Sequence, residues 1–306
     1  MAEVKIPIFG GTFDTDDTGI TSSKDDFEIR NGYLDKNRTI HKRPVMRESG
    51  TDNPTARDIK GLIWWNAEQA FIAMIMGSGN TSVDVYKVTI TLDNTIYPSV
   101  LAYTLIGNIP SVTTALADQY RPSFVLAPNT SNAEVMYMCV GGTKVYQTDA
   151  TSLVDISAAQ STAITALDTV VEVEYLNRRV LALVKDTQQV YYSSSTDPED
   201  FLIASGGGFF EAESNPDKLQ RMIVKGQELV LMGTDTIDYY YGTGDSTVPY
   251  ARFEGGELDI GLTERGLAVS DDNDIYFLDN NRKFKLLRGK QTKDLSLPHA
   301  EKLQLV

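Results

Sequence analysis

The sequence has few of the residues on which catalytic and metal sites most often depend. Its 306 residues include one cysteine, Cys139, and two histidines, His41 and His299. One cysteine excludes an internal disulfide, and three such side chains spread along the chain make a poor zinc site. Cys139 lies in the apolar stretch VMYMCV, so we expect a buried thiol. A lone cysteine is also typical of folding in a reducing cytoplasm.

Long apolar runs are missing as well. The longest, Ala70–Met76, has the length of a strand and falls far short of the roughly 20 residues that a membrane helix needs. The first residues, MAEVKIPIF, lack the charged and then apolar segments of a signal peptide. We therefore expect no membrane span.

Positive charge is scarce relative to negative charge. The chain holds 28 Lys and Arg against 42 Asp and Glu, for a net charge of −14. This balance argues against tight binding to a phosphate backbone, which requires clustered cations. It suits a surface that DNA passes without sticking, because like charges repel. Solubility alone explains the charge equally well.

No arrangement of side chains predicts catalysis. Neither histidine accompanies a G-x-S-x-G nucleophile motif, and no spacing selects a pair of carboxylates for glycoside hydrolysis. The Ser-x-Asp-x-Gly-x-x-Trp box of sialidase-like propellers is absent, since the only tryptophans are Trp64 and Trp65. Gly77–Asn80 is glycine-rich but joins two predicted strands, which favours a hairpin turn over a phosphate loop. We predict no enzyme and no cofactor.

One acidic segment is similar to the start of a calcium loop. Asp14–Gly19 places Gly in the sixth position, and Asp25 falls in the twelfth. Thr18 is a weak ligand in the fifth position, and flanking helices are not evident. Turns favour these residue types in any case, so we interpret the segment as a solvated turn and predict no metal.

Units of short strands recur along the chain. Each has β-branched and aromatic runs between polar turns, the pattern of an antiparallel meander. We place one aromatic residue in the last strand of each of five units: Tyr86, Tyr146, Tyr191, Tyr239 and Phe284. A repeat of about 40–50 residues with about four short strands is typical of a propeller blade. We predict an all-β fold, a β-propeller of about five to six blades, with a β-sandwich as the alternative.

The predicted organisation has two parts. Residues 1–58 are rich in Gly, Asp, Thr and Ser and indicate an extended N-terminal arm or platform, with a disordered tail as the alternative. Residues 59–306 form the propeller. Within it, Thr89–Gln119 reads as a long spacer with two strands and a short helix or loop from Ser111, and Gly242–Gly261 reads as a loop. The spacer or the termini leave room for a sixth blade.

Two adjacent tryptophans stand at the start of the first unit. Trp64 and Trp65 face opposite sides if they lie in a strand. We expect one of them in the core and the other as an interface anchor, because aromatic residues are enriched at interfaces.

Three regions resemble a known family. They are Asn31–Leu34 followed by Lys42–Pro44, then Tyr192–Ser193 through Asp197–Pro198 to Phe201, and the long stretch Val224–Leu303. Together they resemble the tail nozzle, or packaged-DNA stabilisation, proteins of short-tailed bacteriophages. Members generally continue with further strands beyond the last region, so the resemblance leaves the closing of the propeller open.

The resemblance implies a structural role in the virion tail, with assembly in the host cytoplasm. Copies would form a ring, a hexamer by resemblance, below the portal and the head-tail adaptor protein. Tail fibre or spike proteins would be further partners, and DNA would pass through the lumen. In this role Arg43 and Pro44 would dock on neighbouring subunits or the adaptor, with Trp64 and Trp65 as further interface residues. No enzymatic activity is implied.

Two other functions stay open at this point. A propeller could bind or cleave host surface glycans through aromatic residues and paired carboxylates around a concave site. It could also serve as a cytoplasmic interaction scaffold. Assembly into a ring with a through-channel would separate the nozzle from both.

Overall fold

The computed structural model describes residues 57–91, 100–157, 160, 164–212, 217–271 and 274–295, together with two short strands of the N-terminal region. Those strands, β1 (Gly32–Leu34) and β2 (Ile40–Lys42), pair antiparallel. The chain divides into two compact units, one comprising residues 1–50 and 94–98 and the other residues 51–93 and 99–306.

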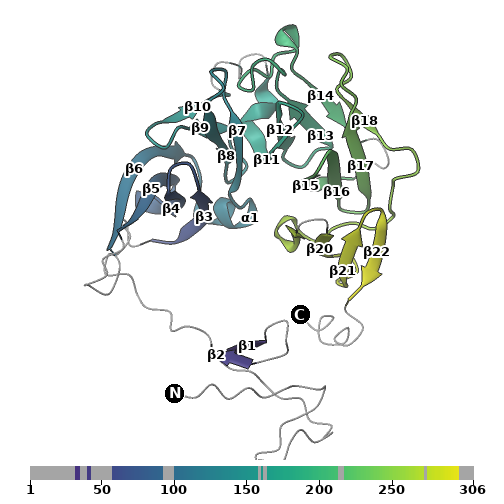
Figure 1. Ribbon diagram of the computed structural model, residues 1–306, viewed down its shortest axis with the longest axis horizontal. Coiled ribbons are helices and arrows are strands. Elements are labelled where there is room, and N and C mark those ends of the chain that lie inside the picture. Colours follow the sequence, from purple (N-terminus) through teal and green to yellow (C-terminus); the bar gives the residue numbers. More distant parts are fainter. Residues whose placement is uncertain are drawn as a thin grey trace, which may run out of the picture. The chain divides into compact units, whose positions relative to one another are not determined.

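The described part of the second unit contains five four-stranded antiparallel sheets (Figure 1). In each sheet the strands follow one another in chain order, so each is a simple meander. This confirms the predicted all-β fold, and the meanders are the blades of the predicted propeller.

The strands of the first three sheets have these bounds: β3 (Ile59–Trp65), β4 (Ala70–Met76), β5 (Ser82–Thr91) and β6 (Val100–Pro110); β7 (Ser123–Pro128), β8 (Glu134–Cys139), β9 (Tyr146–Thr148) and β10 (Leu153–Asp155); β11 (Val170–Leu176), β12 (Arg179–Val184), β13 (Gln189–Tyr192) and β14 (Gly208–Glu211).

The last two sheets comprise β15 (Leu219–Lys225), β16 (Glu228–Gly233), β17 (Ile237–Gly242) and β18 (Tyr250–Arg252), then β19 (Ala268–Asp271), β20 (Asp274–Leu278), β21 (Phe284–Arg288) and β22 (Gln291–Asp294). The described helical segments are α1 (Thr114–Gln119), η1 (Ser78–Asn80), η2 (Thr165–Thr169), η3 (Ile203–Ser205) and η4 (Arg265–Leu267).

The repeating aromatic residue lies on the third strand of every blade, and the expectation of a last strand was wrong. The five positions fall in β5, β9, β13, β17 and β21, and a fourth strand follows each of them. The missed strands β10, β18 and β22 have only three or four residues, and half the residues of β22 are exposed. Such short edge strands carry little apolar pattern.

The predicted spacer Thr89–Gln119 is mostly part of the first blade. β5 runs to Thr91, and β6 is the fourth strand, paired with β5 from Ser82 opposite Pro110 to Thr91 opposite Val100. These two strands have 10 and 11 residues, which accounts for the longer first repeat. The short helix expected after Ser111 is α1, and the backbone N–H of Leu116 donates to the Thr113 hydroxyl that caps it.

The middle strand β12 of the third sheet is buried on both faces because a sheet packs on either side of it. All six residues of β12 are buried. Leu181 and Leu183 join the core shared with the fourth sheet, whereas Val180 and Ala182 join the core shared with the second. Burying each large side chain contributes about 1.5–3 kcal/mol, so successive inter-sheet cores hold the meanders together.

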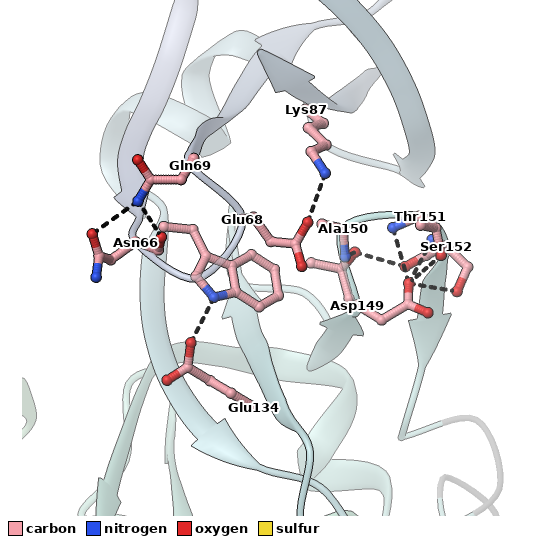
Figure 2. Close-up of polar contacts among 11 residues, drawn as sticks. Asn66, Glu68, Gln69, Lys87, Glu134, Asp149, Ala150, Thr151 and Ser152 are labelled. Atoms are coloured by element: carbon pink, nitrogen blue, oxygen red, sulfur yellow. Dashed lines mark hydrogen bonds and ion pairs between the residues drawn. The ribbon is translucent and has the colours of Figure 1, made fainter. Parts of the chain in front are cut away.

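Two turns show how polar residues close the hairpins. Between β4 and β5, Gly79 and Asn80 adopt positive φ, which confirms a hairpin turn at Gly77–Asn80. Between β9 and β10, the Asp149 carboxylate accepts backbone hydrogen bonds from Thr151 at 2.9 Å and from Ser152 at 2.8 Å (Figure 2). The hydroxyl of Thr151 donates a further hydrogen bond of 2.7 Å, and this bond, together with the two backbone bonds, holds the pKa of Asp149 below its usual range.

Two further expectations concern the core and the membrane. Cys139 is fully buried in β8, as expected for a core thiol. Within the described ranges, no helix has the length and apolar character needed to cross a membrane.

Candidate functional site

A cavity of about 680 Å³ lies where the first strands of several blades meet; we call it the first-strand cavity. Residues from α1 to β7, from the start of β11 and β15, and from the η4 segment line it. They include Tyr120, Arg121, Val171, Gln220, Arg221 and residues 263–269. Segments far apart in the sequence thus form one concave surface.

A bulge in each of two first strands precedes a charged residue of the site. The register shifts between Val170 and Glu172 in β11, and between Leu219 and Arg221 in β15. Bulges redirect side chains and are common beside functional sites. Here they precede an acidic residue and a basic residue on neighbouring blades.

Glu172 and Arg221 form an ion pair between the third and fourth blades. The Glu172 side chain is 2% exposed, and one carboxylate oxygen lies 3.0 Å from Nη1 of Arg221. The other oxygen accepts a 2.6 Å hydrogen bond from the backbone N–H of Met222. Burial raises the pKa of Glu172, while Arg221, Arg265 and the Met222 bond act in the opposite direction.

Arg265 is the most deeply buried cation of the cavity wall. It begins η4 and is 8% exposed, and its guanidinium carbon lies 5.8 Å from the ring centre of Tyr120. Burial lowers its pKa, while the nearby Glu172 opposes the shift. Arginine nevertheless stays charged in proteins. Nη1 of Arg265 and Nε of Arg221 are buried and have no hydrogen-bond partner in the structure.

Glu174 lies two residues beyond Glu172 on β11. Burial, with a contribution from the charge of Glu172, raises the pKa of Glu174 to about 8. Glu174 is therefore protonated at neutral pH. Burial thus disfavours the charged forms of both carboxyls, whereas Arg221 and Arg265 stay charged.

The two adjacent tryptophans differ as expected for neighbours in a strand. Trp65 is 1% exposed and packs in the core between the first and second blades, whereas Trp64 is 41% exposed. The ring of Trp64 meets that of Phe71 edge-on at 4.9 Å. The interface role of Trp64 stays a prediction.

Several predicted residues fall outside the described part of the chain. They are Arg43, Pro44, the segment Asp14–Gly19 with Asp25, and His299, while His41 is described only as a backbone position in β2. In the part that the structure does describe, no group of three or more His, Cys, Asp or Glu side chains is placed to hold a metal ion.

Sequence reasoning missed the cluster around Glu172. One signal was present: VVEVEYL places Glu172 and Glu174 two residues apart in an otherwise apolar strand, so that both lie on one face. Nothing in the sequence indicated that Arg221 and Arg265, 49 and 93 positions further on, would join them.

Some solved structures align with the chain at low identity and low TM-score. PorZ, an essential surface component of the type-IX secretion system of Porphyromonas gingivalis, aligns with 9% identity and a TM-score of 0.44, covering 78% of this chain and 28% of PorZ. The computationally designed Ika4 protein aligns with 10% identity and a TM-score of 0.32, covering 54% of this chain and 89% of that protein. The chain thus spans little more than a quarter of the length of PorZ. No curated protein matches the sequence.

A family model gives the informative match. The model describes bacteriophage P22 Gp10, a β-propeller, and it matches residues 95–286. The matched region runs from β6 through most of β21 and includes the lining of the first-strand cavity. Because it covers more than half of the chain, the protein belongs to the phage stabilisation family of bacteriophage P22 Gp10 and is a β-propeller protein of the phage virion.

Proposed function

We propose that the protein is a tail nozzle subunit. Copies form a ring, a hexamer, below the portal and the head-tail adaptor, and tail fibre or spike proteins attach to it. The ring extends the exit channel and retains packaged DNA until ejection. The observation that carries this proposal is the family match over residues 95–286.

The first blade offers a surface on which copies could meet. Across its four strands Leu62, Ala73, Tyr86 and Leu105 form one row of cross-strand neighbours. Trp64, Phe71, Val88 and Tyr103 form the next row on the same face. This face is opposite to the one that packs on the second blade, which Met74 and Val85 help to form.

The rim of that face is apolar and exposed. Leu62, Trp64, Ile90 and Leu105 are all exposed. Contiguous apolar patches of this kind mark protein–protein interfaces. We call the face formed by the two rows the first-blade face, and we assign it to contacts between neighbouring copies.

The net charge supports passage of DNA without binding. A chain with a net charge of −14 repels a phosphate backbone unless cations are clustered on the facing surface. The lumen of the proposed ring would then guide DNA by repulsion. Tight binding of closed circular DNA, which has no ends, at physiological salt would contradict this part of the proposal.

The decisive experiment is assembly. The purified chain is measured by native mass spectrometry and by two-dimensional class averages of negatively stained particles, alone and mixed with the adaptor of its virion. A ring with an open channel, formed alone or on addition of the adaptor, is the expected result. A chain that stays monomeric in both conditions contradicts the nozzle assignment.

A further inference from the structure

Three arginines that differ in burial line the first-strand cavity. Arg265 is buried, Arg221 has a side chain that is 33% exposed, and Arg121 is exposed. Arg121 lies close to Gly266, where a Cβ added to the glycine would come within 3.4 Å of the Arg121 guanidinium. Three guanidinium groups from three separate segments therefore line one cavity.

Two N–H donors of these guanidinium groups lack a hydrogen-bond acceptor. Nη1 of Arg265 and Nε of Arg221 are both buried, and neither has a hydrogen-bond partner in the structure. A buried charged donor without an acceptor costs free energy, because it has lost water and gained nothing in return. Both atoms are closed to solvent, so a ligand with several acceptor oxygens satisfies them once the two side chains turn toward the cavity.

The lining also holds three acidic side chains, as many as its arginines, and all three are exposed. Glu172 is the carboxylate in contact with Arg221, and its second oxygen is taken by the backbone N–H of Met222. Asp118 is paired with Lys60 at 2.6 Å. Asp186 and Glu264 are exposed at the cavity, where water screens them.

We propose that the first-strand cavity binds the phosphate group of a ligand, held by the buried guanidiniums of Arg265 and Arg221 with Arg121 at the exposed end. Guanidinium groups match the oxygen geometry of phosphate and bind it through charge-assisted hydrogen bonds. A volume of about 680 Å³ also falls in the range of small-molecule sites and exceeds what a phosphate alone fills. The source is either a small phosphate compound or a phosphate of a DNA end.

The test is calorimetric titration of the full chain with inorganic phosphate, with adenosine monophosphate, and with a short DNA duplex bearing 5′-phosphates. Ionic strength is held constant with sodium chloride. We expect saturable binding of at least one probe. The R265Q and R121Q variants should weaken that binding about tenfold or more, as expected for loss of a charge-assisted hydrogen bond.

The matched control is R288Q, which removes the same charge from an exposed arginine that pairs with Asp274 outside the cavity. It should bind the probe as the wild type does. Arg265 is buried, so its replacement can disturb folding, but R121Q alters an exposed side chain and keeps the test valid. Circular dichroism verifies the fold of every variant.

The three probes separate the two sources. Binding of inorganic phosphate or of the nucleotide identifies a small-molecule site, whereas binding of the duplex alone identifies a DNA end. The proposal is overturned if folded wild-type protein binds none of the probes, or if R288Q and R121Q weaken binding equally.

Discussion

The indole N–H of Trp65 donates a 2.8 Å hydrogen bond to a carboxylate oxygen of Glu134, which joins β3 of the first blade to β8 of the second (Figure 2). Trp65 is buried, so its N–H needs a partner inside the protein. The bond also shows that the two adjacent tryptophans have different structural roles. Trp65 links two blades, and Trp64 points to the opposite face.

Removing Glu134 should weaken the junction of the first two blades. In E134A the buried indole N–H loses its acceptor, so we expect the free energy of unfolding to fall by about 1–3 kcal/mol. Denaturant unfolding of E134A, W65F and the double variant measures the interaction free energy between the two side chains. The double variant should be less destabilised than the sum of the two single changes, and strict additivity would show that the hydrogen bond contributes nothing.

The ion pair between Glu172 and Arg221 should matter more than an exposed ion pair. In R221M the Glu172 carboxylate stays buried and loses its contact with Arg221. We expect a loss of about 2–3 kcal/mol, less than for a fully buried pair because Arg221 is one-third exposed. Replacing both residues, as in E172Q/R221M, should recover part of the loss. R288M, which breaks an exposed pair with Asp274, should unfold almost as the wild type does.

Stability should depend on the protonation of Glu174. Its folded-state pKa is about 8 against an ordinary value of 4.5, because burial disfavours the charged form. Between these two values the folded state holds a proton that the unfolded state has released, so stability falls as pH rises through this window. E174Q cannot lose a proton, and its stability relative to wild type should therefore rise from pH 4.5 to pH 8.5. Chemical denaturation at several pH values measures the difference; a constant difference would show that the pKa of Glu174 is not raised in the folded state.

The strand pattern predicted the blades better than it predicted their edges. The buried middle strands carry continuous apolar runs such as VLALV in β12, which a sequence pattern detects directly. The edge strand β22 has the sequence QTKD, with two of its four residues exposed, and only its pairing with β21 makes it a strand. A short edge strand is specified by its neighbour, so local composition does not reveal it.

The reason why the charged cluster could not be predicted from the sequence is a different one. Glu172, Arg221 and Arg265 come from three blades, and their proximity follows from how the blades pack. A charge within an apolar strand signals a buried polar partner, but it does not say where in the sequence that partner lies. The interface residues Arg43 and Pro44 fall outside the described part of the chain, and their role stays a prediction.

Gly261 should tolerate no side chain. A Cβ at this position would lie only 1.8 Å from the carbonyl oxygen of Thr234, and backbone atoms cannot move aside as a flexible side chain does. We expect G261A to lower the free energy of unfolding by about 3 kcal/mol or more. G244A is the comparison, because Gly244 has a φ of +77° but no atom within 4 Å of a Cβ. Its cost should be only about 1–2 kcal/mol of backbone strain. Equal losses in thermal or denaturant unfolding would show that the contact with Thr234 relaxes freely.

Trp64 should affect assembly more than it affects the stability of the subunit. Its ring is 41% exposed on the first-blade face, and its described ring contact is the edge-on packing with Phe71. If neighbouring copies meet there, W64A should weaken association about 30-fold or more, as loss of an aromatic hot spot does. The matched control is I203A, which truncates an exposed apolar side chain of η3 on the third blade. Analytical ultracentrifugation over a range of concentrations measures association, and thermal unfolding verifies the fold. Ring formation by W64A at wild-type concentrations would place the contact between copies on another surface, while a loss in both variants would point to a more extended interface.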